Sequence, residues 1–194
     1  MDTKVNNLEI WKHIKGFEGI YEISNFGRVK SLRVKGSYKL TSSVSKIINP
    51  VNITGGYLGV RLHNNGVVKK YRIHVLVANH FLENHFNYKY VNHLNENPAD
   101  NHFKNLEFVN HRENVTYSKN KKNYTSNLVG VSFNKLNIKN KWRSQIGING
   151  KCKHIGCFSS EQEAHNAYLK ALNQYGLNNK YAINPLKPTA EAHH

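Results

Sequence analysis

Residues 91–114 read VNHLNENPADNHFKNLEFVNHREN, a short stretch of a basic protein that is rich in histidine and asparagine. Short apolar runs at residues 90–91 and 106–109 predict two strands, and the polar residues 95–105 between them predict a loop. Asn110, with a glutamate three residues on at capping-box spacing, predicts the start of a helix. The local order is therefore strand, loop, strand, helix. Its histidines and asparagines belong either to a polar surface loop or to a site whose ligands are spread over these elements.

The segment upstream, from about residue 51, predicts a hairpin and a helix. Residues 56–62 and 67–74 alternate like strands around the turn at residues 64–66. Apolar residues at helical spacing over residues 74–82 then predict a short helix.

Residues 1–50 predict a small β-rich module with a basic edge. Strand-like stretches lie around Tyr21 and Val29, and the turn at residues 25–27 has a glycine in its last position. The expected small core consists of Trp11, Ile14, Phe17 and Tyr21.

The C-terminal segment predicts three strands and one helix. Strand signals lie at residues 129–133, 142–148 and 153–158, and an amphipathic helix runs from a Ser160 capping box to Gly176. We expect a polar, basic linker at the start of the segment and a poorly ordered tail from about Asn178.

The predicted fold class is α+β and modular, with a β-rich N-terminal module, a central ββα core and a C-terminal three-stranded antiparallel sheet plus one helix. The expected boundaries are 1–50 for the first module, 51–118 for the core, 119–126 for the linker, 127–178 for the third module and 179–194 for the tail.

The composition bounds the class of protein. In 194 residues, 39% are hydrophobic, which is enough for packed cores. No run approaches 18 apolar residues and the start has no signal-peptide core, so we expect a cytoplasmic protein that is neither secreted nor bound to a membrane. Cys152 and Cys157 are too few for a disulfide framework or a four-thiolate zinc site.

The charge is the strongest compositional signal. The 28 Lys and Arg against 12 Asp and Glu give a net charge of +16, and nine basic residues with no acid lie between Lys119 and His154. Such a patch is typical of nucleic-acid binding, because it releases the counterions of a polyanion. The alternative is a merely solvated basic face.

The residues also carry three family resemblances. IHVLVANHF followed by the opening stretch resembles HNH nucleases of the phage and intron-encoded homing type. Residues 9–32 resemble the nuclease-associated modular DNA-binding motif that precedes such cores. Residues 129–172, VGVSFNKLNIKNKWRSQIGINGKCKHIGCFSSEQEAHNAYLKAL, are similar to the plant ethylene-response-factor (APETALA-type) DNA-binding domain, which places a three-stranded sheet in the major groove.

The HNH resemblance implies roles for individual residues. His93 is the general base that activates a water, while Asn92 and Asn114 supply oxygens to one Mg²⁺ or Mn²⁺ ion. Asn105 holds the loop by backbone hydrogen bonds, and His74 stands where related sequences also have a histidine. Many relatives have an aspartate at the place of Asn92, and an amide is the weaker ligand. We therefore expect the DNA phosphate to complete the metal site.

A zinc site is the alternative use of the histidines. His80, His85, His102 and His111 are numerous, but zinc prefers cysteines or paired histidines at i, i+4, and His80 and His85 are five apart.

The resulting hypothesis is a site-specific, metal-dependent DNA endonuclease of the HNH type that acts as a monomer on double-stranded DNA and nicks one strand. The alternative is a DNA-binding or regulatory protein with an inactive HNH fold. Candidate DNA contacts are Arg28, Lys30, Arg33, Arg61, Arg112, Lys121, Lys122, Lys135, Lys141, Trp142, Arg143, Lys151 and Lys153.

Overall fold

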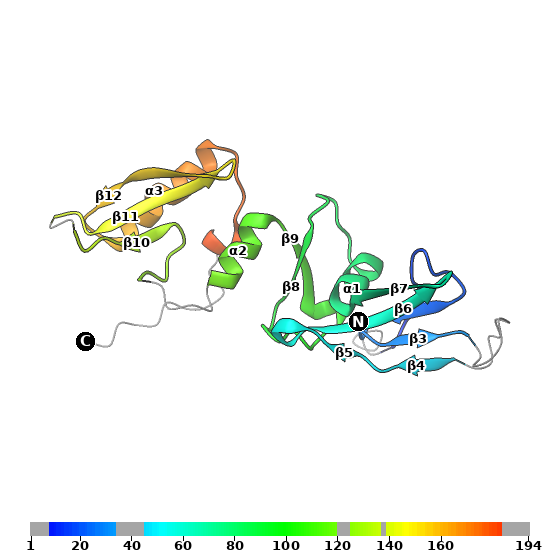
Figure 1. The fold of residues 1–194 in the computed structure, drawn as a ribbon. Coiled ribbons are helices and arrows are strands. Elements are labelled where there is room, and N and C mark those ends of the chain that lie inside the picture. The colour runs from blue at the N-terminus through cyan, green and yellow to red at the C-terminus, as the bar shows by residue number, and fades with distance from the viewer. Residues whose placement is uncertain (1–7, 34–44, 120–124, 137–138, 184–194) are drawn as a thin grey trace, which may run out of the picture. The chain divides into compact units, whose positions relative to one another are not determined.

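The computed structural model describes residues 8–33, 45–119, 125–136 and 139–183. It divides into two compact units, Met1–Val109 and Asn110–His194, each built from small antiparallel sheets and few helices (Figure 1). The α+β prediction is confirmed at this level. Among the described helices, none has the length and apolar character needed to cross a membrane.

The described residues of the first unit form three antiparallel sheets and one α-helix. A four-stranded sheet has the order β1 (Trp11–His13), β2 (Tyr21–Ser24), β3 (Val29–Ser31) and β4 (Lys46–Ile48). A three-stranded sheet has the order β5 (Val51–Asn52), β6 (Leu58–Asn64) and β7 (Val67–Arg72). Helix α1 (Ile73–Phe81) follows directly, and the hairpin of β8 (Tyr90–His93) and β9 (Leu106–Val109) closes the unit. Two 3₁₀ turns, η2 (Thr54–Gly56) and η3 (Phe103–Asn105), lie in the connections.

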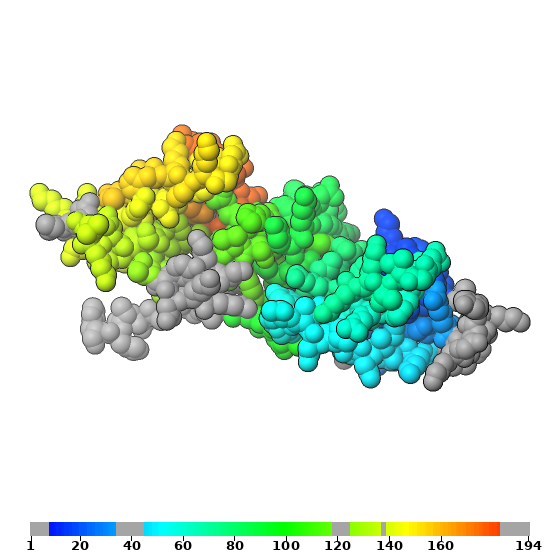
Figure 2. All heavy atoms as spheres, viewed as in Figure 1, coloured from blue at the N-terminus to red at the C-terminus, as the bar shows by residue number. Residues whose placement is uncertain are grey.

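One hydrophobic core serves the whole first unit. Ile23 and Val29 of the N-terminal sheet, Leu62 of β6, Val77 of α1 and Leu106 of β9 are buried in the same cluster. In the space-filling view, the blue, cyan and green atoms of these elements accordingly form one continuous body (Figure 2). The expected separate core of the N-terminal module is therefore only part of a larger one.

Trp11 is not a member of this core, although we expected it there. Its ring is half-buried and faces two cations: the ammonium of Lys30 lies 4.3 Å from the ring centroid and the guanidinium of Arg28 lies 5.8 Å from it. Ile14, Phe17 and Tyr21 are buried as predicted.

The second unit has a sheet of β10 (Val131–Phe133), β11 (Trp142–Ile148) and β12 (Lys151–Phe158), with helix α3 (Glu161–Gln174) packed against it (Figure 1). Ile146 on β11 is buried against Tyr168, Ala171 and Leu172 of α3. Because side chains alternate along a strand, the neighbours of Ile146 on β11 face away from the helix. The other face of the sheet is thereby left to polar and basic side chains.

Helix α2 (His111–Lys119) also belongs to the second unit. Its capping box forms as predicted: the backbone amide of Glu113 donates to Asn110 Oδ1 at 2.9 Å, and the backbone amide of Asn110 donates to Glu113 Oε2 at 3.0 Å. Helix α2 packs against α4 (Lys180–Ile183), where the buried Asn179 donates to Thr116 Oγ1 at 2.9 Å. The poorly ordered tail expected from Asn178 is thus wrong for these first residues, because they pack on α2.

Candidate active site

The site residues are carried by the β8–β9 hairpin and the loop that joins its strands. His93 is the last residue of β8 and pairs with Leu106, while Asn92 pairs with Glu107. Both site residues are buried, with 4% of the surface of His93 and 5% of that of Asn92 exposed. The strand end places a histidine at the edge of the unit's core, beside the polar loop.

Asn105, at the end of the 94–105 loop, forms hydrogen bonds with residues at the start and in the middle of that loop. Its backbone carbonyl accepts from the Leu94 amide at 2.8 Å, and its Oδ1 accepts from the Asn95 amide at 2.9 Å. Its Nδ2 donates to the Asp100 carbonyl at 2.8 Å. The loop is therefore closed by one amide side chain at its C-terminal end.

The other asparagines of the loop make similar local bonds. Asn95 Nδ2 donates to Asp100 Oδ2 at 2.7 Å, and Asn97 Oδ1 accepts from the Ala99 amide at 3.1 Å. Amide and carboxylate side chains here fix a turn-rich backbone that has few apolar side chains to pack. The asparagine content of the opening stretch thus has a structural role.

His74, the second residue of α1, lies against His93. The two ring centroids are 5.0 Å apart, and the ring of Tyr57 lies 4.9 Å from that of His74 and 5.8 Å from that of His93. Burial lowers the pKa of His74 to about 4, with smaller contributions from the nearby charges of His93 and Arg72. His74 is therefore neutral at pH 7, and its buried Nδ1 has no hydrogen-bond partner among the described residues.

Asn101 is the site residue that the sequence did not single out. It is 4% exposed, and its Oδ1 lies 3.4 Å from Nε2 of His93. One asparagine among many in a polar loop has no distinguishing spacing, and only its contact in the folded chain identifies it.

The two expected metal ligands, Asn92 and Asn114, lie in different units of the structure. Asn92 lies beside His93 on β8, and its amide oxygen is a ligand type that Mg²⁺ accepts, although weaker than a carboxylate. Asn114 lies on α2 in the second unit, so its share in a metal site stays a prediction from the motif. Asn92 alone cannot complete the coordination of a hard cation. Further oxygen ligands, such as those of a DNA phosphate, are therefore needed.

The histidines that suggested zinc have other partners. His80 Nδ1 bonds to the Leu76 carbonyl at 2.6 Å, His85 Nε2 lies 2.9 Å from Glu83 Oε2, and the ring of His102 stacks on Phe26. Within the described residues no group of three or more His, Cys, Asp or Glu side chains is arranged to hold a metal.

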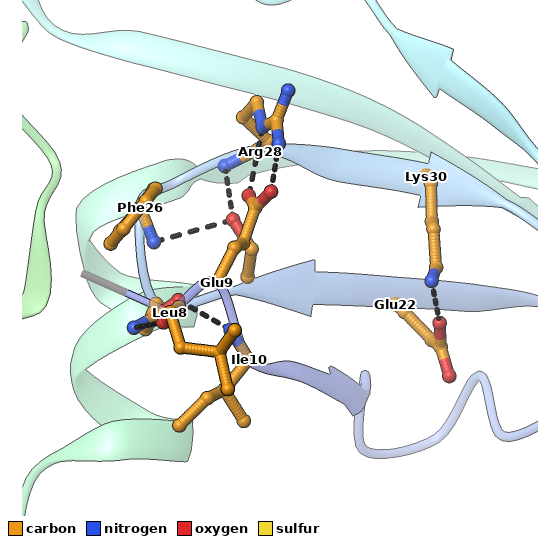
Figure 3. A network of polar contacts seen from close by, with 9 residues as sticks. Leu8, Glu9, Ile10, Glu22, Phe26, Arg28 and Lys30 are labelled. Carbon is orange, nitrogen blue, oxygen red and sulfur yellow. Dashed lines mark hydrogen bonds and ion pairs between the residues drawn. The ribbon is translucent and has the colours of Figure 1, made fainter. Parts of the chain in front are cut away.

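Two of the candidate DNA contacts in the first unit are paired with acids (Figure 3). Arg28 forms a two-pronged ion pair with Glu9, in which Nε donates to Oε1 at 2.8 Å. Lys30 Nζ lies 2.7 Å from Glu22 Oε2. Their charges are thus partly neutralised within the module, whereas Arg33 and Arg61 are exposed.

The candidates in the second unit fall into two groups. Arg112 Nη2 donates to the Gly147 carbonyl at 2.6 Å, and Lys153 Nζ donates to the Tyr175 hydroxyl at 2.6 Å, so both bind within the unit. Arg143 lies on the face of β11 turned away from α3, where its Nε donates to His154 Nδ1 at 3.3 Å. The candidates Lys135, Lys141 and Lys151 are exposed, as is Lys153.

Trp142 packs within the sheet, since its ring meets that of Phe133 edge-to-face at 5.2 Å. The candidates Lys121 and Lys122 lie outside the described residues.

The chain is similar to known proteins over part of its length. Residues 9–75 match the NUMOD4 motif. That match extends beyond the N-terminal sheet to include Tyr57 and His74. The relatives given next are HNH endonucleases to which the chain is similar over part of its length.

The chain is 35% identical to the DNA endonuclease I-HmuI of Bacillus phage SP01 over 105 residues, which is 54% of this chain and 55% of that protein. It is 39% identical to an uncharacterized HNH endonuclease of Acanthamoeba polyphaga mimivirus over 115 residues, or 57% of this chain and 26% of that protein. A solved structure of DNA binding and cleavage by the HNH homing endonuclease I-HmuI is 32% identical, with a TM-score of 0.49, and covers 60% of this chain and 62% of that one. The chain thus spans between about a quarter and about half of the curated relatives it matches.

Proposed function

We propose that this protein is a site-specific, metal-dependent DNA endonuclease in which His93 acts as the general base. The observation that carries the proposal is the placement of His93 at the end of β8, in contact with the neutral His74 and with Asn101. An imidazole held in one orientation can accept the proton of an attacking water at neutral pH.

In the proposed reaction, His93 removes a proton from water and the resulting hydroxide attacks the scissile phosphorus. The bond from phosphorus to the 3′-oxygen breaks, and the leaving oxygen takes a proton from a second water. A divalent cation held by Asn92 and by the phosphate, with Asn114 as the further ligand that the motif alone implies, would supply charge neutralisation and acidify that second water. Asn105 keeps the loop, and therefore the end of β8, in place.

DNA affinity is proposed to reside mainly in the second unit. Its sheet presents Arg143 on the face opposite α3, and exposed lysines flank that face. The similarity of this segment to the ethylene-response-factor type supports the same surface. Phosphate contacts from such a face bind many sequences and make affinity depend on salt.

A plasmid assay tests the activity. Supercoiled DNA carrying a target, incubated with the protein and Mg²⁺, should give open-circular product, and EDTA should prevent this. The chain carries a single HNH motif, so we propose a monomer that nicks one strand. Linear product at the earliest times, with a rate rising as the square of protein concentration, would contradict the monomer.

A second candidate function is a DNA-binding protein without nuclease activity. The observation that favours it is Asn92, an amide where a carboxylate would bind a cation more tightly. Failure to cleave any target with Mg²⁺ or Mn²⁺, together with retained DNA binding, would support it.

A further inference from the structure

We propose that Asn101 and the turn at residues 25–27 are positioning elements for His93, so that this turn of the NUMOD4 motif serves the active site directly. The proposal rests on the proposed function for the role of His93, but the contacts that support it do not depend on that role.

Asn101 favours one tautomer of His93. The Asn101 Nδ2 donates to the carbonyl of Ala99 at 3.0 Å, which orients the amide because a carbonyl only accepts. Its Oδ1 therefore faces Nε2 of His93, at 3.4 Å. Since this oxygen can only accept, the contact is a hydrogen bond in the tautomer that carries the proton on Nε2, and we infer that Asn101 favours this tautomer.

Residues 25–27 of the turn contact residues of the 94–105 loop in antiparallel order. The carbonyl of Asn25 accepts from the amide of Phe103 at 2.8 Å. The ring of Phe26 stacks on that of His102 with centroids 4.9 Å apart. Gly27 then lies against Asn101. Three consecutive residues of the motif thus contact three consecutive residues of the loop, ending at the one that bonds to His93.

The backbone of Gly27 lies so close to Asn101 that it leaves no room for a side chain. Its φ is +82°, and a Cβ on it would lie 2.6 Å from Cβ of Asn101 and 3.3 Å from the Asn101 carbonyl oxygen. Any larger residue here must push Asn101 away from its place. The backbone of Asn101 is therefore positioned by direct contact with the N-terminal motif.

The turn itself is anchored. Asn25 is 3% exposed, its Oδ1 accepts from the Ile10 amide at 2.8 Å, and its Nδ2 donates to the Leu8 carbonyl at 3.2 Å. Its neighbour Ser24 accepts from the amide of Arg28 at 3.0 Å, a bond drawn in Figure 3. A turn fixed on both sides can resist displacement of the loop that it contacts.

The glycines of the same module provide a matched experiment. Gly16 has a φ of +81°, almost the value of Gly27, but a Cβ on Gly16 would meet nothing within 4 Å. Gly16→Ala and Gly27→Ala therefore carry the same backbone strain and differ in the contact with Asn101. We expect Gly27→Ala to lower the single-turnover cleavage rate by roughly 10- to 100-fold, as loss of a supporting contact does at other sites. Its Kd for DNA should stay within about twofold. Gly16→Ala should cleave at nearly the normal rate.

Substitutions of Asn101 distinguish the effect of its hydrogen bond on the cleavage rate from the effect of its side-chain volume. Asn101→Leu removes the acceptor at similar size and should lower the rate as much as Gly27→Ala, with unchanged Kd. Asn101→Asp keeps an oxygen at the same position and should recover most of the rate. In the Asn101→Gly background, which lacks the clashing Cβ, Gly27→Ala should have little further effect.

Nitrogen NMR of the His93 ring gives a readout that needs no cleavage. We expect the Nε2-protonated tautomer in the unmodified protein and a mixture of tautomers in Asn101→Leu. An Nδ1-protonated ring in the unmodified protein, or normal cleavage by a folded Asn101→Leu, would overturn the proposal. If the unmodified protein cleaves no DNA, the proposed function fails, and the tautomer measurement still decides the positioning role. Thermal melts identify any variant that does not fold. If Gly27→Ala does not fold, the cleavage rate of Asn101→Leu tests the positioning role instead.

Discussion

The ring of His74 lies against the ring of His93 with centroids 5.0 Å apart and an angle of 64° between their planes. The ring of Tyr57 lies 4.9 Å from that of His74 and 5.8 Å from that of His93, so the three rings pack together, and Arg72 adds a positive charge at the start of α1. Nothing acidic is among the causes that shift the pKa of His74, so protonation of this buried ring finds no compensating charge. His74 therefore packs against the proposed base as a neutral side chain.

The lowered pKa of His74 makes the stability of the protein depend on pH. Its folded pKa is about 4, against 6.5 for an ordinary histidine, so the unfolded chain binds the proton more readily between these values. The free energy of unfolding should fall as the pH drops from 6.5 to 4, by up to about 3 kcal/mol from this residue. His74→Leu should show a weaker fall in urea titrations, whereas His63→Gln at an exposed site should behave normally. Parallel pH curves for His74→Leu and the unmodified protein would contradict this.

His93→Ala should abolish cleavage and leave DNA affinity within a few-fold. Loss of a general base typically costs about 10²–10⁴ in rate, whereas the proposed affinity rests on basic side chains elsewhere. Plasmid relaxation and a binding titration on the same DNA measure the two effects. His63→Ala, at an exposed position of β6, is the control. Equal cleavage by His93→Ala would remove His93 from the mechanism.

Asn92→Asp should keep or improve metal-dependent cleavage, because a carboxylate binds a hard cation better than an amide does. The Mg²⁺ concentration for half-maximal rate should decrease. Asn97→Asp adds the same charge to the exposed part of the loop and should leave that concentration unchanged. An Asn92→Asp variant that is inactive at every Mg²⁺ and Mn²⁺ concentration would show that Asn92 does not bind the metal.

Arg143→Ala should weaken DNA binding and reduce the slope of log K against log salt by about 1, as expected for one phosphate contact. Lys170→Ala, on the exposed surface of α3, removes the same charge from the opposite side of the sheet and should change the slope less. Lys153→Ala should also have a smaller effect, because Tyr175 already holds its ammonium. Equal slopes for all three variants would indicate a general electrostatic effect.

Deleting residues 119–194 should likewise weaken binding and flatten its salt dependence, since nine basic residues lie between Lys119 and His154. The deletion also removes Asn179 and Lys180, which bond to Thr116 and Glu113 of α2. Helix α2 would lose its packing, so the point substitutions are the sharper measurement. If the slope of log K against log salt is unchanged after the deletion, the DNA contacts lie in the N-terminal unit instead.

The local elements of this protein can be predicted from the amino-acid sequence. The β8–β9 hairpin, the capping boxes at Asn110 and Ser160, and the strands of the C-terminal sheet all appear where they were expected. Each depends on residues a few positions apart, so periodicity and capping chemistry are sufficient to predict it. The role of His93 is likewise predicted from an ordered motif of contiguous residues.

The distant residues that surround His93 become apparent only in the folded chain. Gly27 lies more than 70 positions before Asn101, and nothing local to either residue predicts that they touch. His74 and Tyr57 reach His93 because α1 and the β5–β6 connection pack on the same core. The ion pairs of Arg28 and Lys30 depend in the same way on the register of β1, β2 and β3. Contacts across such separations follow from how the sheets and α1 pack together, which no short stretch of the sequence encodes.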